Sequence, residues 1–207
     1  MNGLVLAGGQ SSRMGQPKSL LQYHGKPQYQ HVADMLSGFC ERVFISCRAE
    51  QQSLFEGVET IFDSDSYGDI GPLNGVLSAF LVAQLSESLV PKKSGSESLI
   101  PAWFVIGCDY PFLEQSDLEQ LVRARNPDCL ATVFVNPDTQ FPEPLLGIYE
   151  AAAGPLLKEW LQMGNESLRR FLEKNEVQMV IPQHPECLKS VDTPEEMFIW
   201  LKGDLGI

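Results

Sequence analysis

Short apolar segments alternate with segments of helical periodicity along most of the chain, and no other sequence feature limits the possible folds as strongly. Runs that indicate strands fall at residues 4–7, 42–47, 58–62, 102–107, 129–135, 145–149 and 177–181. Apolar residues between them recur at helical spacing, as in Val32, Met35, Leu36 and Phe39. This alternation favours a mostly parallel sheet covered by helices on both faces. We therefore expect one α/β domain of three layers over residues 1–207.

Two further features mark boundaries within this pattern. Ser116 and Glu119 form a capping box that predicts the start of a helix, and a last helix is expected at 193–200. The segment 86–98 is rich in Ser, Lys and Glu and has no periodic apolar face. We expect a mobile surface insertion there.

The composition argues against several classes of function. The 27 acidic and 15 basic residues give a net charge of -12, so we expect no nucleic-acid partner. No apolar run approaches the ~18 residues of a membrane helix, and the apolar stretch at 3–7 is too short for a signal peptide. We therefore expect a cytoplasmic protein with no membrane partner. The five cysteines include no C-x-x-C pair, which favours buried free thiols over disulfides or structural zinc.

The first 33 residues contain no Asp or Glu, although they contain Arg13, Lys18 and Lys26. Within this segment, a predicted strand runs into the loop L-A-G-G-Q-S-S-R-M-G-Q-P-K at 6–18. Glycines let backbone N–H groups wrap a phosphate chain, and basic side chains neutralise its charge. The loop matches neither a Walker A motif nor G-x-G-x-x-G. It indicates an anion site of another type; the alternative is a glycine-rich turn with surface cations.

Glycine or aspartate residues follow the ends of three of the predicted strands. In mostly parallel sheets, ligands bind at the carboxyl ends of the strands. This rule singles out Gly8, Gly9, Asp63 and Asp109. Each aspartate also has a simpler interpretation, because Asp109 can begin a turn and Asp63 can be a solvated loop carboxylate.

The loop at 6–18 resembles the signature loop of the nucleotidyltransferases that act on molybdopterin, and the pattern is most similar to that of the molybdenum cofactor guanylyltransferases. The likeness continues in the family's order through G-K-P at 25–27, G-P-L-x-G at 71–75, C-D-x-P-F at 108–112, P-E-P-L at 142–145, S-L-R-R-F-L at 167–172 and V-D-T-P-E-E at 191–196. The loop and C-D-x-P-F are together the most specific of these motifs, which cover nearly the whole chain.

This resemblance implies a single Rossmann-like domain of the nucleotide-diphospho-sugar transferase type. Such enzymes transfer GMP from GTP to the terminal phosphate of molybdenum-bound molybdopterin, release pyrophosphate and use Mg²⁺. Carried over by motif, the expected catalytic residues are Arg13, Lys18 and Asp109, of which Arg13 and Lys18 clamp the triphosphate and Asp109 holds the metal. The expected nucleotide-binding residues are Leu6, Ala7, Gly8, Gly9, Lys18, Ser46, Asp63 and Asp109. The resemblance also implies a monomer that passes its product to molybdoenzymes or to other proteins of cofactor biosynthesis.

Two departures from the family pattern concern the base. Ser46 stands where guanylyltransferases tend to show Asn, and 190–194 reads S-V-D-T-P where they often show N-x-N-T-P. The Asp at that place, Asp192, is also seen in relatives that use CTP; it is either a second metal ligand or an acid at a helix N-terminus. The L-A-G-G start favours guanine. The alternatives are a cytidylyltransferase or other nucleotidyltransferase acting on a related phosphorylated acceptor, and a non-catalytic nucleotide-binding protein.

Some side chains have an ordinary interpretation that we favour over a functional one. Arg169 and Arg170 either hold the pterin phosphate or are surface cations of a helix, and the second interpretation is favoured. Trp103, Phe104 and Trp160 are expected in the core rather than in a pterin-stacking face.

Overall fold

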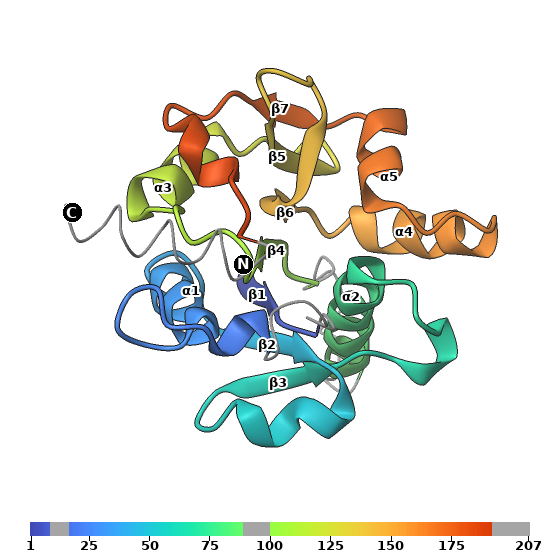
Figure 1. The fold of residues 1–207 in the computed structure, drawn as a ribbon. Helices are drawn as coiled ribbons and strands as arrows, with labels where there is room; N and C mark the ends of the chain where they lie inside the picture. Colours follow the sequence, from blue (N-terminus) through green and yellow to red (C-terminus); the bar gives the residue numbers. More distant parts are fainter. Residues whose placement is uncertain (9–16, 89–99, 192–207) are drawn as a thin grey trace.

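A seven-stranded sheet forms the middle layer of the protein (Figure 1). The computed structural model describes residues 1–8, 17–88 and 100–191. The strands are β1 (Asn2–Leu6), β2 (Val43–Cys47), β3 (Glu59–Phe62), β4 (Trp103–Gly107), β5 (Ala131–Val135), β6 (Pro142–Tyr149) and β7 (Gln178–Val180). Their order across the sheet is β3-β2-β1-β4-β6-β5-β7. Every predicted strand is present, which confirms the α/β class.

Helices cover both faces of the sheet. The α-helices of the described residues are α1 (Gln28–Ser37), α2 (Pro72–Ser88), α3 (Gln115–Ala124), α4 (Ala153–Gln162) and α5 (Leu168–Lys174). The helices α1 and α3 pack on one face, and α2, α4 and α5 pack on the other (Figure 1). The predicted three-layer arrangement is therefore confirmed.

Alternate residues of the central strands enter two separate cores. In β1, Leu4 packs on the side of α2, whereas Val5 packs on the side of α1. In β4, Trp103 and Phe104 divide in the same way and are 1% and 0% exposed. A strand that is buried on both faces is apolar throughout, which is why these strands are visible in the sequence. Trp103 and Phe104 are core residues, as predicted.

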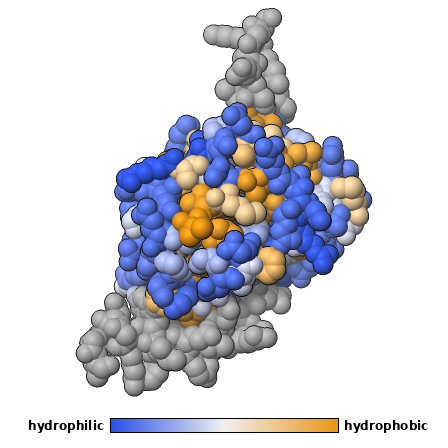
Figure 2. Space-filling model, turned by 90° about the horizontal axis from the view of Figure 1, so that it is seen from above, coloured by the Kyte–Doolittle hydropathy of each residue, from blue (hydrophilic) through white to orange (hydrophobic). Residues whose placement is uncertain are grey.

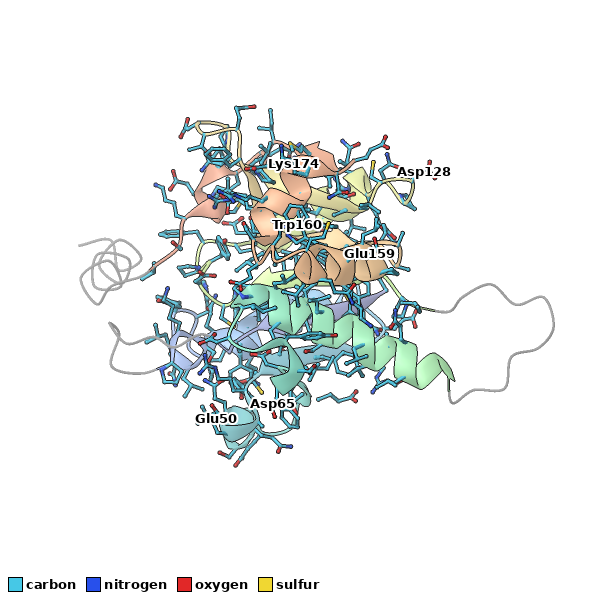
Figure 3. All side chains as sticks on the ribbon, turned by 90° about the vertical axis from the view of Figure 1, so that its right-hand side faces the viewer. Glu50, Asp65, Asp128, Glu159, Trp160 and Lys174 are labelled. Atoms are coloured by element: carbon cyan, nitrogen blue, oxygen red, sulfur yellow. The ribbon has the colours of Figure 1, made fainter. Side chains whose placement is uncertain are left out.

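Trp160 lies between α4 and α5, where Figure 3 labels it. Its indole N–H donates a hydrogen bond to the carbonyl of Ser167 at 3.3 Å, and its ring meets that of Phe171 edge-on. The side chain is half-buried and packs against the core on this face. Trp160 therefore holds the two helices together, in agreement with its predicted core role.

One strand runs against the others. β6 pairs antiparallel with both β4 and β5, whereas the remaining pairings are parallel. The cause is the connection, because only residues 136–141 join β5 to β6. A parallel return requires a crossover of about a dozen residues or more. The first residues of β6 therefore lie near the carboxyl ends of the parallel strands.

The helix boundaries differ from prediction in two places. α3 begins two residues earlier than expected, because Asp117 rather than Glu119 accepts a backbone N–H, that of Glu114, at 2.9 Å. α2 continues to Ser88, so the first residues of the predicted insertion at 86–98 are helical. The rest of that insertion and the predicted helix at 193–200 lie outside the described residues.

All five cysteines are free thiols, and four of them are buried. Within residues 1–8, 17–88 and 100–191, no helix is long and apolar enough to cross a membrane.

β7 is a short edge strand with apolar side chains at the surface. Figure 2 views the molecule from above Figure 1 and shows apolar residues gathered near the middle of a largely hydrophilic face. Met179 in β7 and Ile181 directly after it are 42% and 62% exposed. Three residues are few for an edge strand, and a short edge limits pairing with other chains.

We expect Glu150→Gln to lower the free energy of unfolding by about 2 kcal/mol. Glu150 follows β6 and accepts two hydrogen bonds from Arg125, at 2.7 and 2.8 Å, with its side chain only 10% exposed. The control is Glu59→Gln, which weakens an ion pair to Arg42 whose side chains are more than half exposed and which should cost under about 1 kcal/mol. Urea unfolding of both variants measures the difference; equal losses would contradict this account.

Candidate active site

A cavity of about 710 Å³ opens at the carboxyl ends of β1, β2, β3 and β4. β1 has β2 on one side and β4 on the other, so the chain reverses its direction across the sheet at this point. Such a reversal leaves a crevice between the connections that leave neighbouring strands. The cavity is lined by Leu6, Ala7, Gly8, Lys18, Ser19, Ser46, Arg48, Ala49, Glu50, Asp63, Ser64, Asp65, Gly68, Asp69, Gly71, Pro72, Asn74, Gly75, Gly107, Cys108, Asp109 and Leu145.

This lining brings together most of the residues singled out in the sequence. Those that line the cavity are Leu6, Ala7, Gly8, Lys18, Ser46, Asp63 and Asp109. They come from chain segments that are more than 100 residues apart in sequence, and the fold places them around one volume. Gly9, Arg13 and Asp192 lie outside the described residues. The roles assigned to all of these residues stay predictions.

The floor of the cavity is built around Asp63, which directly follows β3. The Ser46 hydroxyl at the end of β2 donates a hydrogen bond to Asp63 Oδ1 at 3.1 Å. Burial raises the pKa of Asp63, and the bond from Ser46 and the nearby Arg48 oppose that shift. A Cβ on Gly8 would lie 3.2 Å from Asp63 Oδ2, so glycine is what allows β1 to approach this carboxylate. Ser46 therefore orients Asp63.

Asp109 stands across the cavity, at the end of β4. Its side chain packs over Gly107, where a Cβ would lie 2.6 Å from Asp109 Oδ1. Its own carbonyl accepts a hydrogen bond from the Val191 N–H at 3.1 Å. The neighbouring Cys108 N–H donates to the Leu6 carbonyl at 3.3 Å, which ties this loop to β1. These contacts fix the backbone that carries the Asp109 carboxylate.

Lys18 begins a 3₁₀ turn, η1 (Lys18–Leu20), whose continuation is anchored to the Asp109 loop. Leu21 and Tyr23 are buried with Val191, and Phe112 packs against them. Hydrogen bonds from Gln28 to the Tyr110 carbonyl and from His24 to the Pro111 carbonyl join the same two segments. The cation and the carboxylate are therefore held on one connected platform.

Two lining residues escaped the sequence analysis. Asn74, inside the G-P-L-x-G motif, is 4% exposed and donates to the carbonyls of Ser64 and Gly68 at 3.0 and 2.8 Å. It thereby holds the loop that follows Asp63. Arg48 directly follows β2 and lies 3.4 Å from Asp69. Its position after a strand, like that of Asp63 and Asp109, is the signal that could have found it.

The charges of the lining are mixed, and carboxylates outnumber cations. Glu50, Asp65 and Asp69 add to Asp63 and Asp109, whereas the described lining cations are Lys18 and Arg48. Figure 3 shows Glu50 and Asp65 near one another at the β3 end of the molecule, far from Lys174 and Asp128. A triphosphate would enter this carboxylate-rich space most readily with a divalent cation.

The donor set fits Mg²⁺ held jointly with a substrate. Among the described residues, no group of three or more His, Cys, Asp or Glu side chains forms a metal site. Mg²⁺ needs no such cage, because it is commonly held by one or two carboxylates together with substrate phosphates. Asp109, half-buried at the strand end, has a carboxylate of the kind that such a site requires.

If the GTP expected from the sequence binds in this cavity, Gly75→Ala should weaken its binding at least about 10-fold, or ~1.4 kcal/mol. Gly75 lies in α2 against the cavity floor, where a Cβ would overlap Ser46 Oγ and lie 2.7 Å from Leu6 Cδ2. Ser46 must then move, and Asp63 loses its hydrogen bond. Calorimetric titration with GTP measures the loss. Gly38→Ala makes the same change in right-handed backbone after α1, remote from the cavity, and should leave binding unchanged; unchanged binding in Gly75→Ala would contradict the placement of the nucleotide.

The amino-acid sequence of this chain is similar to those of known proteins. The sequence pattern of the MobA-like NTP transferase domain matches residues 3–180. A molybdenum cofactor biosynthesis bifunctional protein of Synechocystis sp. is 30% identical over 94% of this chain, which spans only 52% of that protein. A molybdenum cofactor guanylyltransferase of Shewanella amazonensis is 24% identical, with 95% of this chain and 93% of that protein covered.

A solved structure shows the same fold. Molybdopterin-guanine dinucleotide biosynthesis protein A from Archaeoglobus fulgidus superposes with a TM-score of 0.74 at 22% identity, and the match covers 100% of both chains. The described residues therefore form a single α/β domain of this architecture, and the expected fold type is confirmed.

Proposed function

The chain belongs to the MobA-like NTP transferase family, and we propose that it transfers GMP from GTP to the terminal phosphate of molybdenum-bound molybdopterin. The membership bears out the resemblance seen in the motifs. The observation that carries the proposal is that Leu6, Ala7, Gly8, Lys18 and Asp109 line one cavity. A nucleotide bound there has backbone beside it, a cation for its phosphates and a carboxylate for a metal ion.

The proposed reaction needs charge neutralisation and alignment more than a protein nucleophile. An oxygen of the acceptor phosphate forms a bond to the α-phosphorus of GTP, the bond to the bridging oxygen of the β-phosphate breaks, and pyrophosphate leaves with that electron pair. Because the acceptor phosphate is already ionised, no strong general base is required. Lys18 would bind the departing phosphates, and the platform that connects it to Asp109 keeps the two at a fixed separation.

The cofactor that we propose is Mg²⁺, which Asp109 would hold. Bound there, Mg²⁺ supplies positive charge to the phosphate oxygens as charge develops on them. Arg13 is proposed to join Lys18 at the triphosphate, and Asp192 is proposed as either a second ligand or a helix-capping acid. Asp63, oriented by Ser46, would contact the nucleoside.

The remaining parts of the proposal concern the setting of the reaction. We propose a cytoplasmic monomer that hands its product to molybdoenzymes or to other proteins of cofactor biosynthesis. Family membership and the names of the relatives support the nucleotide and molybdopterin as substrates, and the location, the monomeric state and the protein partners are proposed by analogy.

Calorimetric titration with GTP, CTP, ATP and UTP, each with and without Mg²⁺, tests the nucleotide assignment. We expect GTP to bind at least 10-fold more tightly than the others, a difference of ~1.4 kcal/mol that one or two hydrogen bonds to the base supply. Selective binding of CTP would replace the proposal by a cytidylyltransferase. Binding of no nucleotide would contradict it.

A further inference from the structure

The first residues of β6 lie beside the nucleotide cavity because this strand is antiparallel. Ile106 pairs with Leu146, so the residues before Leu145 continue past the end of β4, where Asp109 follows. Leu145 itself lines the cavity. Glu143 precedes it by two positions and therefore lies on the same face of the strand. Glu143 therefore lies next to Leu145, which forms part of the cavity wall.

Glu143 is half-buried among groups of both charges. The Tyr110 hydroxyl donates a hydrogen bond to its carboxylate, and Asp109 and Arg169 are close enough to act on it electrostatically. Burial and the charge of Asp109 raise the pKa of Glu143, whereas Arg169 and the bond from Tyr110 lower it. The side chain is therefore a hydrogen-bond acceptor that is held near both Asp109 and a guanidinium.

That guanidinium belongs to α5 and is held over an aromatic ring. The Arg169 Cζ atom lies 5.6 Å from the ring centroid of Phe141, which directly precedes β6 and is 46% exposed. The cation–π contact restrains the guanidinium beside Glu143 while its N–H groups stay available for an anion. α5 and α2 cover the same face of the sheet (Figure 1), and the N-terminal residues of α2 line the nucleotide cavity.

We propose that Arg169 and Glu143, with Phe141 beneath the guanidinium, form the acceptor subsite. Arg169 binds an anionic group of the acceptor, and Glu143 accepts hydrogen bonds from the adjacent N–H groups of a planar heterocycle such as a pterin. This inference rests on the proposed function. It assigns the nucleotide to the β1–β3 side of Asp109 and the acceptor to the β6–α5 side.

The arrangement suits the geometry of the transfer. In-line displacement requires the attacking oxygen and the departing pyrophosphate to lie on opposite sides of the α-phosphorus. The proposal puts the acceptor on the β6 side of β4, which carries Asp109, and the nucleotide on the side of β1, β2 and β3. A subsite with both a cation and a carboxylate also favours acceptors that carry an anionic group together with hydrogen-bond donors over acceptors that carry only an anionic group.

The variants Glu143→Gln and Arg169→Gln test the subsite in two ways. Transfer assays give the KM for molybdenum-loaded molybdopterin and for GTP, and fluorescence anisotropy gives the Kd of a fluorescent pterin phosphate without any turnover. We expect both variants to raise the acceptor KM and the pterin Kd at least about 10-fold and to leave the KM for GTP within about 2-fold. Arg170→Gln and Glu173→Gln, which change exposed neighbours on α5, should behave as the unchanged protein.

A structural role for Glu143 predicts a different outcome. If Glu143 acts only by holding Tyr110 and the Asp109 loop, Tyr110→Phe will reproduce the effect of Glu143→Gln, and the KM values for GTP and the acceptor will rise together. That result, or an unchanged acceptor KM in both folded variants, overturns the subsite. Absence of transfer by the unchanged protein would instead contradict the proposed function. The effect of the two variants on the Kd of the pterin phosphate would still show whether these residues bind a pterin.

Discussion

Asp109→Asn is expected to reduce nucleotidyl transfer at least about 1,000-fold, or about 4 kcal/mol in the activation free energy. Asp109 is the carboxylate at the end of β4, packed over Gly107 and fixed through its own carbonyl by Val191. Asn keeps the size of the side chain but removes the negative charge that a divalent cation needs. The variant should therefore fold normally and lose its response to Mg²⁺. Pyrophosphate release as a function of Mg²⁺ concentration measures the loss.

The matched control for this variant is Asp128→Asn. Asp128 is exposed and lies far from the cavity, at the β5–β7 end of the molecule (Figure 3). We expect its activity and its thermal midpoint to equal those of the unchanged protein. Full Mg²⁺-dependent transfer by a folded Asp109→Asn protein would remove Asp109 from the metal site.

Lys18→Ala is expected to reduce transfer about 100- to 1,000-fold, the usual cost of removing one charge-stabilising donor from a site of this kind. Lys18 lines the same cavity as Asp109 and begins η1, whose following residues are buried with Phe112 and Val191. Those buried residues keep the backbone in place when the side chain is shortened. Because Lys18 would act on the triphosphate, the KM for GTP should rise while the acceptor KM changes little.

Lys158→Ala on the exposed surface of α4 removes the same charge away from the cavity. Its kinetic constants should match those of the unchanged protein. A loss of activity in Lys158→Ala as large as that in Lys18→Ala would show that overall charge, rather than a contact in the cavity, governs the rate.

The sheet was largely predictable from the sequence because most of its strands are buried on both faces. Leu4 and Val5, or Trp103 and Phe104, point to opposite cores, so no polar residue interrupts the run. The first part of β6 was hidden by Pro142 and Pro144, since proline lacks an N–H for the ladder and argues against a central strand. Both lie beyond the last residue pair with β4, where no such N–H is required on that side.

The cavity was predictable only where a polar residue follows the end of a strand within two positions. Asp63 and Asp109 satisfy that rule, and the fold brings them to one volume. Asn74 acts through hydrogen bonds to a loop ten residues earlier in the chain, a contact that depends on how α2 packs. Glu143 and Arg169 meet only because β6 is antiparallel and α5 returns to its face. The periodicity of apolar residues and the spacing of motifs in the sequence carry no information about such long-range contacts.

Transfer of label from GTP tests the central claim most directly. The protein is incubated with GTP labelled at the α-phosphate, Mg²⁺ and molybdenum-loaded molybdopterin, in parallel with CTP labelled in the same way. We predict that label from GTP alone enters the pterin product and that one pyrophosphate is released for each GMP transferred. Transfer from CTP alone, or nucleotide binding without transfer to this acceptor, would contradict the account.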